Sequence, residues 1–291
     1  MNAFLTAFEE FMKTQPFRVI RLSEMKPGGE ISTFEMTEAN FCQNVYSVAK
    51  TFTMTAIGLL WDRGALSLDE KIVSILGDEI APDIREKMDP RWEDSTVETA
   101  LTHRLGFPGG FLDIDVTPSS VFGPDYLGYA LAHPLAYAPG TGAKYSDGAF
   151  YVLSRIAGKK AGEPMDAFLW RELFYPLGFQ EMAWSKCPAG HPMGATGLYV
   201  HSSDMVKLGA LYLAGGVWNG RRILSENWVR LAEERGFALD WDGEHRICFK
   251  GGMYGQKLIF SPEQNRAVAV QAYGGNSDAV AEWVRDEGAK Y

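Results

Sequence analysis

The chain has 291 residues, of which 46% are hydrophobic and 22% charged, a composition typical of a folded globular protein. Its formal net charge is −9 and no basic run stands out, which argues against a surface for nucleic acid or anionic lipid. No stretch of eighteen or more apolar residues occurs, so no transmembrane helix is expected. The length suits one large domain or two smaller ones that share a core.

The N-terminal segment predicts an amphipathic helix and not a secretory signal. Phe4, Phe8 and Met12 lie on one face of such a helix. A signal would begin with basic residues, whereas this segment has none at its start and is interrupted by Glu9 and Glu10. A cytoplasmic location is therefore expected.

The rest of the chain alternates between strand and helix patterns. Two short runs, 17–22 and 31–36, flank a Gly-rich turn and predict a β-hairpin. From 45 to about 237 the apolar spacing is mainly helical, with expected helices at 96–102, 126–132, 148–158, 165–175, 203–214 and 225–234. Near the C-terminus the pattern predicts strands at 246–249, 255–260 and 267–273, and a last helix at 277–287.

Strands at both ends of the chain with helices between them predict an α+β fold. In this fold, one antiparallel sheet is formed by N- and C-terminal strands, is flanked by helices, and carries a large, mostly helical insert. The expected sheet subdomain is 1–44 plus 245–291, and the expected helical subdomain is 45–244. The active site is expected between the two.

A serine and a lysine, Ser47 and Lys50, stand three residues apart where a helical pattern begins. Residues at i and i+3 lie on the same face of a helix. An apolar stripe follows, so the lysine should be partly desolvated, which favours its neutral form and makes it a possible base for the serine hydroxyl. Asn44 is the expected cap and would place Ser47 in the first turn, near the positive end of the helix dipole.

Acyl transfer needs more than a base: a second proton carrier, a positive group for the substrate and donors for the oxyanion. Tyr145 follows a Gly- and Pro-rich loop, opens a predicted helix and could act as a base. Lys250 precedes Gly251 and Gly252 on a predicted C-terminal strand. Because these glycines lack side chains, a substrate could approach the strand edge there.

These motifs resemble those of the serine β-lactamase and penicillin-binding-protein superfamily, nearest the branch of class C β-lactamases, DD-peptidases and family VIII esterases. Ser47-Val48-Ala49-Lys50 matches S-x-x-K, Tyr145-Ser146-Asp147 resembles Y-x-N, and Lys250-Gly251-Gly252 resembles K-T-G or H-x-G. Connecting segments in the family's order extend the resemblance over roughly residues 4–285. It implies a β-lactamase/transpeptidase-like fold.

The resemblance also implies roles for individual residues. Ser47 would be the nucleophile, Lys50 its proton partner, and Tyr145 the proton carrier between nucleophile and leaving group. Substrate binding would fall to four further residues: Asp147, Lys250, Gly252 and Met253. Lys250 would hold a substrate carboxylate or tune Tyr145, and the backbone amides of Ser47 and Met253 would form the oxyanion hole.

The sequence therefore predicts a serine hydrolase that forms an acyl-enzyme on an ester, amide or β-lactam bond, with an esterase favoured over a true β-lactamase. The alternative is a catalytically weak or inactive relative that uses the same cleft to bind a ligand. Three departures from the family pattern keep this alternative open: Asp147 replaces an amide, Gly251 replaces a hydroxyl residue, and Arg104-Leu105 replace two small polar residues. An ionised Asp147 only accepts hydrogen bonds, so it should pair with Lys50 or Lys250 and favour the charged ammonium.

No cofactor and no metal are expected. The three cysteines are scattered, and His191 and His201 lack metal-ligand spacing. His103 is expected to stabilise the loop after the helix at 96–102. The expected partner is a small ester, amide or β-lactam substrate, with no nucleic acid and no membrane, and the sequence leaves the oligomeric state open.

Overall fold

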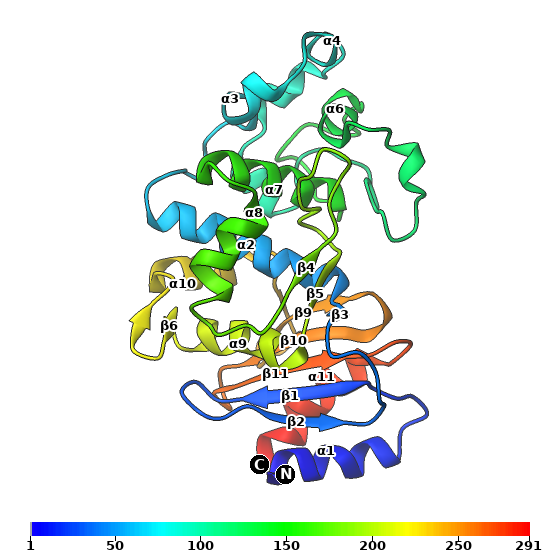
Figure 1. Cartoon of the computed structure of the whole chain (residues 1–291), viewed down its shortest axis with the longest axis vertical. Helices are drawn as coiled ribbons and strands as arrows, with labels where there is room; N and C mark the ends of the chain where they lie inside the picture. Colours follow the sequence, from blue (N-terminus) through cyan, green and yellow to red (C-terminus); the bar gives the residue numbers. More distant parts are fainter. Residues whose placement is uncertain (1) are drawn as a thin grey trace. The chain divides into compact units, whose positions relative to one another are not determined.

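The computed structural model describes residues 2–291, which divide into two compact units (Figure 1). Unit 1 contains the described residues up to Val48 together with 173–183 and 198–291, and unit 2 contains 49–172 and 184–197. The units differ from the expected subdomains in that 45–48, 173–183 and 198–244 group with the sheet. None of the helices in residues 2–291 is both long and apolar enough to cross a membrane.

Unit 1 is built on a six-stranded sheet with the order β2-β1-β11-β10-β9-β8, in which every pairing is antiparallel. Its strands are β1 (Arg21–Met25), β2 (Ser32–Glu35), β8 (Asp240–Trp241), β9 (Cys248–Gly252), β10 (Gln256–Ser261) and β11 (Arg266–Gln271). The N-terminal β1 pairs with the C-terminal β11, and Leu22 lies opposite Val270. The predicted α+β fold, with one sheet made from both ends of the chain, is therefore confirmed.

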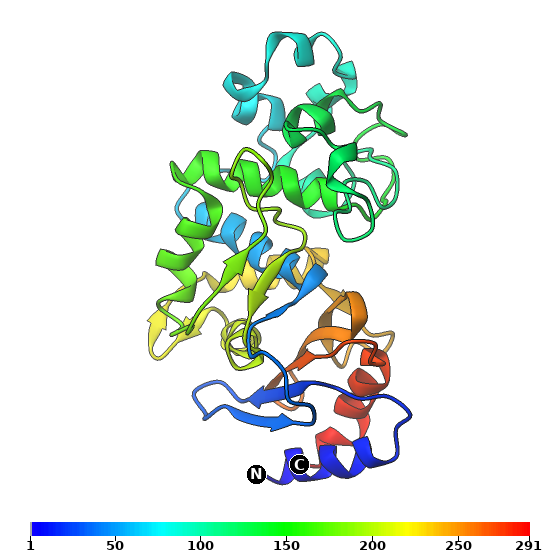
Figure 2. The ribbon, with the colours of Figure 1, turned by 45° about the vertical axis from the view of Figure 1, so that its right-hand side comes forward.

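Helices cover both faces of this sheet (Figures 1 and 2). On one face, α1 (Ala3–Lys13) and α11 (Ser277–Asp286) share a core with Val268 and Val270 of β11. On the other face lies α9 (Ser202–Leu213), whose Gly209 is so close that a Cβ there would lie 2.8 Å from that of Ala267. Successive β11 residues thus face opposite sides of the sheet and pack into different cores, because side chains alternate along a strand.

The first strand is shifted from its predicted place, since β1 spans Arg21–Met25 and not 17–22. All five of its residues are buried, including polar ones. Arg21 pairs with Glu35 at 3.0 Å, and the Ser23 hydroxyl lies 2.8 Å from that of Ser202. The polar side chains are satisfied inside the fold, so the apolar pattern did not mark the strand.

Smaller elements complete unit 1. β3 (Gln43–Asn44) pairs antiparallel with β5 (Leu198–Val200), and β6 (Val217–Trp218) pairs with β7 (Arg221–Arg222). β4 (Ala183–Trp184) lies where the chain passes from unit 1 into unit 2. α10 (Glu226–Arg235) begins at the cap Ser225, whose hydroxyl accepts from the Trp228 amide at 3.0 Å.

Unit 2 is helical, and its central members are α2 (Ala49–Asp62) and α7 (Asp147–Ala161), which contact each other. Every α2 residue from Ala49 to Leu60 is buried, as in a helix packed on all sides. The other helices are α3 (Ile72–Leu76), α4 (Pro82–Arg85), α5 (Val97–Leu101), α6 (Tyr126–Ala132) and α8 (Met165–Leu169), which continues as a π-helix over Trp170–Phe174. The helices predicted in this part of the chain are confirmed.

Candidate active site

Ser47 lies in a short 3-10 turn, Tyr46–Val48, that runs directly into α2. Asn44 caps this turn, because its side-chain oxygen accepts a hydrogen bond from the Tyr46 amide at 2.9 Å. Tyr46 itself has a φ of +48°, a left-handed conformation that is unfavourable for a tyrosine. A strained residue directly before the serine is a feature often seen at functional sites.

Strand β9 passes close to this turn within unit 1. A Cβ at Gly252 would lie 2.4 Å from the Val45 carbonyl oxygen and 3.3 Å from the Ser47 amide nitrogen. Only glycine permits this approach of two backbones. Met253 follows at once, so the two amides predicted to form the oxyanion hole belong to neighbouring backbone segments. Gly252 therefore acts by positioning these segments.

The other residues of this β9 motif are placed differently. A Cβ at Gly251 would meet only the Lys257 Cε, at 3.7 Å, which is an ordinary van der Waals contact, so the backbone there does not require glycine. Lys250 is buried, and its Nζ lies 3.4 Å from an Asp240 carboxylate oxygen of β8. The missing hydroxyl at Gly251 is thus a chemical departure from the family pattern that packing does not demand.

Lys50 is fully buried within unit 2. Its Nζ donates hydrogen bonds to the Asp147 carboxylate at 2.7 Å and to the Ala195 carbonyl at 2.9 Å. It also hydrogen-bonds to the Tyr145 side chain, whose ring centroid lies 4.7 Å from the nitrogen. The structure thus brings Lys50, Tyr145 and Asp147 together, and the predicted ion pair between Asp147 and a lysine is confirmed for Lys50.

The charge state of Lys50 differs from the one expected from burial alone. Burial by itself lowers the pKa of this lysine, but the Asp147 carboxylate and Tyr145 outweigh it, so the pKa is raised above its ordinary value of 10.5. Desolvation acts in the expected direction, but the other expectation prevails, that an ionised Asp147 favours the charged ammonium. The lysine is an ammonium at neutral pH because Asp147 compensates for its burial.

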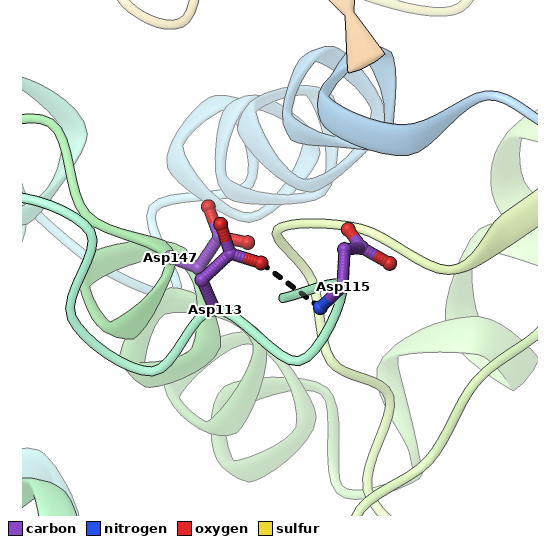
Figure 3. A group of neighbouring side chains, drawn as sticks. All are labelled: Asp113, Asp115 and Asp147. Carbon is purple, nitrogen blue, oxygen red and sulfur yellow. Dashed lines mark hydrogen bonds between the residues drawn. The ribbon is translucent and has the colours of Figure 1, made fainter. Parts of the chain in front are cut away.

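Two further carboxylates, Asp113 and Asp115, lie beside Asp147 (Figure 3). Oxygen atoms of the three side chains lie within 4.8 Å of one another, and the Asp115 amide donates to Asp113 at 2.9 Å. Burial raises the pKa of Asp115, while its hydrogen bond from Thr196 opposes the rise. Neither residue was predicted from the sequence, since two aspartates in a loop give no distinctive pattern.

This acidic cluster has oxygen donors of the kind that hard cations prefer. One of its carboxylates already binds the Lys50 ammonium. We therefore assign Asp113 and Asp115 to the electrostatic surroundings of Lys50.

His103 supports Tyr145 structurally, in agreement with its expected role in the loop after α5. Its Nδ1 accepts a hydrogen bond from the Ser146 amide at 3.3 Å, and its ring centroid lies 4.5 Å from that of Tyr145. Its carbonyl accepts from the Lys144 amide at 3.0 Å. These contacts fix the backbone that leads into α7 and orient Tyr145, of which 45% is exposed.

Comparison with known proteins agrees with the motifs. The fold resembles a protein from Bacillus anthracis described as a 6-aminohexanoate-dimer hydrolase, with a TM-score of 0.75 and 14% identity over 94% of this chain and 79% of that one. It also resembles a penicillin-binding protein from Bacillus halodurans, with a TM-score of 0.70 and 18% identity over 98% of each chain. These identities establish the shared fold alone. A family model described as beta-lactamase matches residues 33–289, and the chain therefore belongs to the beta-lactamase family.

Proposed function

We propose that this protein is a serine hydrolase that forms an acyl-enzyme at Ser47. The observation that carries the proposal is the fully buried Lys50 ammonium, three residues after the serine on one helical segment and held by Asp147 at 2.7 Å. A buried ion pair is a weak source of stability. A buried lysine with a shifted pKa, close in sequence to a candidate nucleophile, is instead a common feature of active sites.

The proposed roles differ from those of a neutral-lysine mechanism. Ser47 Oγ attacks the substrate carbonyl, and the amides of Ser47 and Met253 donate to the oxygen that becomes negative. An ammonium cannot accept the serine proton, so Lys50 stabilises negative charge nearby and orients Tyr145. In its phenolate form, beside the Lys50 ammonium, Tyr145 accepts the Ser47 proton and passes it to the leaving alkoxide, which departs as an alcohol. Tyr145 then takes a proton from the water that attacks the acyl-enzyme and returns it to Ser47 as the acid is released.

We propose uncharged esters as the preferred substrates. Asp147, Asp113 and Asp115 form a cluster of three carboxylates, of which Asp147 pairs with Lys50, and such a cluster disfavours a substrate carboxylate. Gly251 lacks the hydroxyl that would donate to such a group. Both features weaken binding of a β-lactam carboxylate and leave a neutral acyl ester unaffected.

Parallel turnover of a short-chain nitrophenyl ester and a chromogenic cephalosporin tests this proposal. We expect a higher kcat/KM for the ester, and loss of ester turnover by a factor of about 10⁴–10⁶ in Ser47→Ala. Faster turnover of the cephalosporin would refute the ester preference. Residual ester turnover in Ser47→Ala within tenfold of wild type would refute the nucleophile.

Asp147 and Gly251 depart from the family motifs, and these departures favour a second candidate, a ligand-binding protein without significant catalysis. In that case an ester or β-lactam would bind reversibly and neither would acylate Ser47. Rapid-quench mass spectrometry during turnover separates the two functions, because only the hydrolase accumulates a covalent acyl adduct.

A further inference from the structure

Three tyrosines gather beside the serine turn within unit 1, and we call them the tyrosine platform: Tyr46, Tyr254 and Tyr273. The Tyr46 and Tyr254 ring centroids lie 5.2 Å apart in an edge-to-face arrangement. The Tyr254 and Tyr273 rings stack with centroids 4.6 Å apart. Tyr254 is 41% exposed and Tyr273 is 71% exposed, so the platform presents aromatic surface to solvent.

The platform brackets the candidate oxyanion hole along the chain. Tyr46 directly precedes Ser47, and Tyr254 directly follows Met253. The backbones at both places are neighbours, as the close approach of Gly252 to Ser47 demonstrates. A substrate whose carbonyl oxygen is bound by these two amides would therefore have the platform beside it.

The backbone gives no local reason for tyrosine at two of these positions. Tyr46 and Tyr254 have φ values of +48° and +61°, where glycine or asparagine would be less strained. The Tyr254 carbonyl accepts a hydrogen bond from the Gly274 amide at 3.0 Å, which fixes its turn against the loop that carries Tyr273. A rigid, strained and partly exposed arrangement of rings suggests that the side chains serve a ligand.

We propose that the tyrosine platform binds an aromatic ring of the substrate, carried close to the scissile ester bond. Stacked and edge-to-face contacts between rings are favourable beyond the area that they bury, so an aromatic group is favoured over a saturated ring of similar size. This inference rests on the proposed function, because it takes Ser47 as the reacting group. It adds a substrate class that the family resemblance does not supply.

Two matched ester pairs test the proposal: ethyl phenylacetate with ethyl cyclohexylacetate, and benzyl acetate with cyclohexylmethyl acetate. Hydrolysis is followed in a pH-stat, so the assay needs no aromatic chromophore. We expect the aromatic member of at least one pair to be preferred by roughly 3–10-fold, mainly through KM, because stacking aids ground state and transition state alike. Equal KM values in both pairs would overturn the proposal.

Variants identify the residues responsible. Tyr254→Leu and Tyr273→Leu should reduce the aromatic preference towards unity, whereas Tyr254→Phe should keep it. Tyr175→Leu removes a tyrosine that is 74% exposed elsewhere in unit 1 and is the matched control. Tyr273→Leu alters a strongly exposed side chain, so this variant is expected to fold like the wild type. Full retention of the preference in this variant and in Tyr254→Leu would contradict the assignment.

Binding to Ser47→Ala separates this inference from the proposed function. Dissociation constants of benzyl acetate and cyclohexylmethyl acetate, measured by ligand-observed NMR, require no acylation. Tighter binding of benzyl acetate by a protein whose wild type hydrolyses no ester would support the platform and refute the hydrolase. Ester hydrolysis without any aromatic preference, in turnover or binding, would refute the platform and leave the hydrolase intact.

Discussion

Replacing Asp147 with asparagine tests the electrostatic account of Lys50. At 2.7 Å, and with an effective dielectric constant of about 20, the charge pair has a gross attraction of about 6 kcal/mol. Removing one partner of a buried pair costs about 3–5 kcal/mol, and the asparagine oxygen should restore one hydrogen bond of about 1 kcal/mol. The free energy of unfolding should therefore fall by about 2–4 kcal/mol, which lowers Tm by roughly 3–7 °C in a chain of this length.

The same substitution should change selectivity. Without the carboxylate, burial of Lys50 acts with less opposition, so its pKa falls and a neutral amine becomes accessible. The site also loses one charge that repels a substrate carboxylate. We therefore expect Asp147→Asn to raise β-lactam acylation relative to ester hydrolysis, measured as the second-order rate of acylation by a penicillin and kcat/KM for a short-chain ester.

Asp204→Asn is the matched control for this experiment. Asp204 is fully buried in α9 and pairs with Lys207 at 2.6 Å, so its loss should cause a comparable fall in Tm. Asp204 lies in unit 1 and has no role in the proposed mechanism. The rate of β-lactam acylation relative to ester kcat/KM should therefore not change in Asp204→Asn. An unchanged or lower ratio in Asp147→Asn would refute our account of how Asp147 sets substrate preference.

The pH dependence of stability tests whether Asp147 sets the pKa of Lys50. A raised folded-state pKa means that the pair contributes its full stability below pH 10.5 and loses it as the pH rises through the folded-state pKa. Because the pKa of Lys50 falls in Asp147→Asn, the variant should gain stability as the pH rises from its own lowered Lys50 pKa towards 10.5, so its Tm difference from wild type should narrow over that range. A Tm difference that stays constant up to pH 10.5 would show that the Lys50 pKa does not fall in the variant and would contradict the account.

Four further substitutions have defined outcomes. Gly252→Ala would place a Cβ 2.4 Å from the Val45 carbonyl, so the serine turn must move and ester kcat/KM should fall by about 10²-fold, whereas a fall below threefold would refute the positioning role. Lys50→Ala and Tyr145→Phe should each slow acylation by about 10²–10⁴-fold in stopped-flow assays, and normal acylation in either would exclude that residue. Burial raises the pKa of Glu233 to about 7, so stability falls as the pH rises from 4.5 to 7. Glu233→Gln should thus stabilise the protein by about 1–2 kcal/mol at pH 8, after allowance for partial exposure, and little at pH 5, whereas equal gains at both would contradict that shift.

The sequence predicted those parts of the fold that apolar spacing marks. The helices α5, α6, α7 and α11 and the C-terminal strands follow regular patterns, and all are present close to their expected bounds. Strand β1 was misplaced because its buried residues include Arg21, Ser23 and Glu24, whose partners come from distant parts of the chain. Polar burial of this kind depends on tertiary contacts that local periodicity does not contain.

The candidate site was predictable only in part, for a similar reason. Motif spacing singled out Ser47, Lys50 and Tyr145, and the residue type of Asp147 predicted its ion pair. The charge state of Lys50 depends on a balance between burial and a carboxylate 97 positions away, which sequence alone does not weigh. The tyrosine platform likewise arises from three separate turns that only the fold brings together.

The central claim is that Ser47 is a nucleophile, and active-site labelling tests it most directly. Wild-type protein and Ser47→Ala are treated with a fluorophosphonate and examined by intact-mass spectrometry, followed by peptide mapping. We predict a single adduct on wild type, located at Ser47, and none on the alanine variant, with both proteins showing the same Tm. No adduct on wild type, or an equal adduct on Ser47→Ala, would contradict the account.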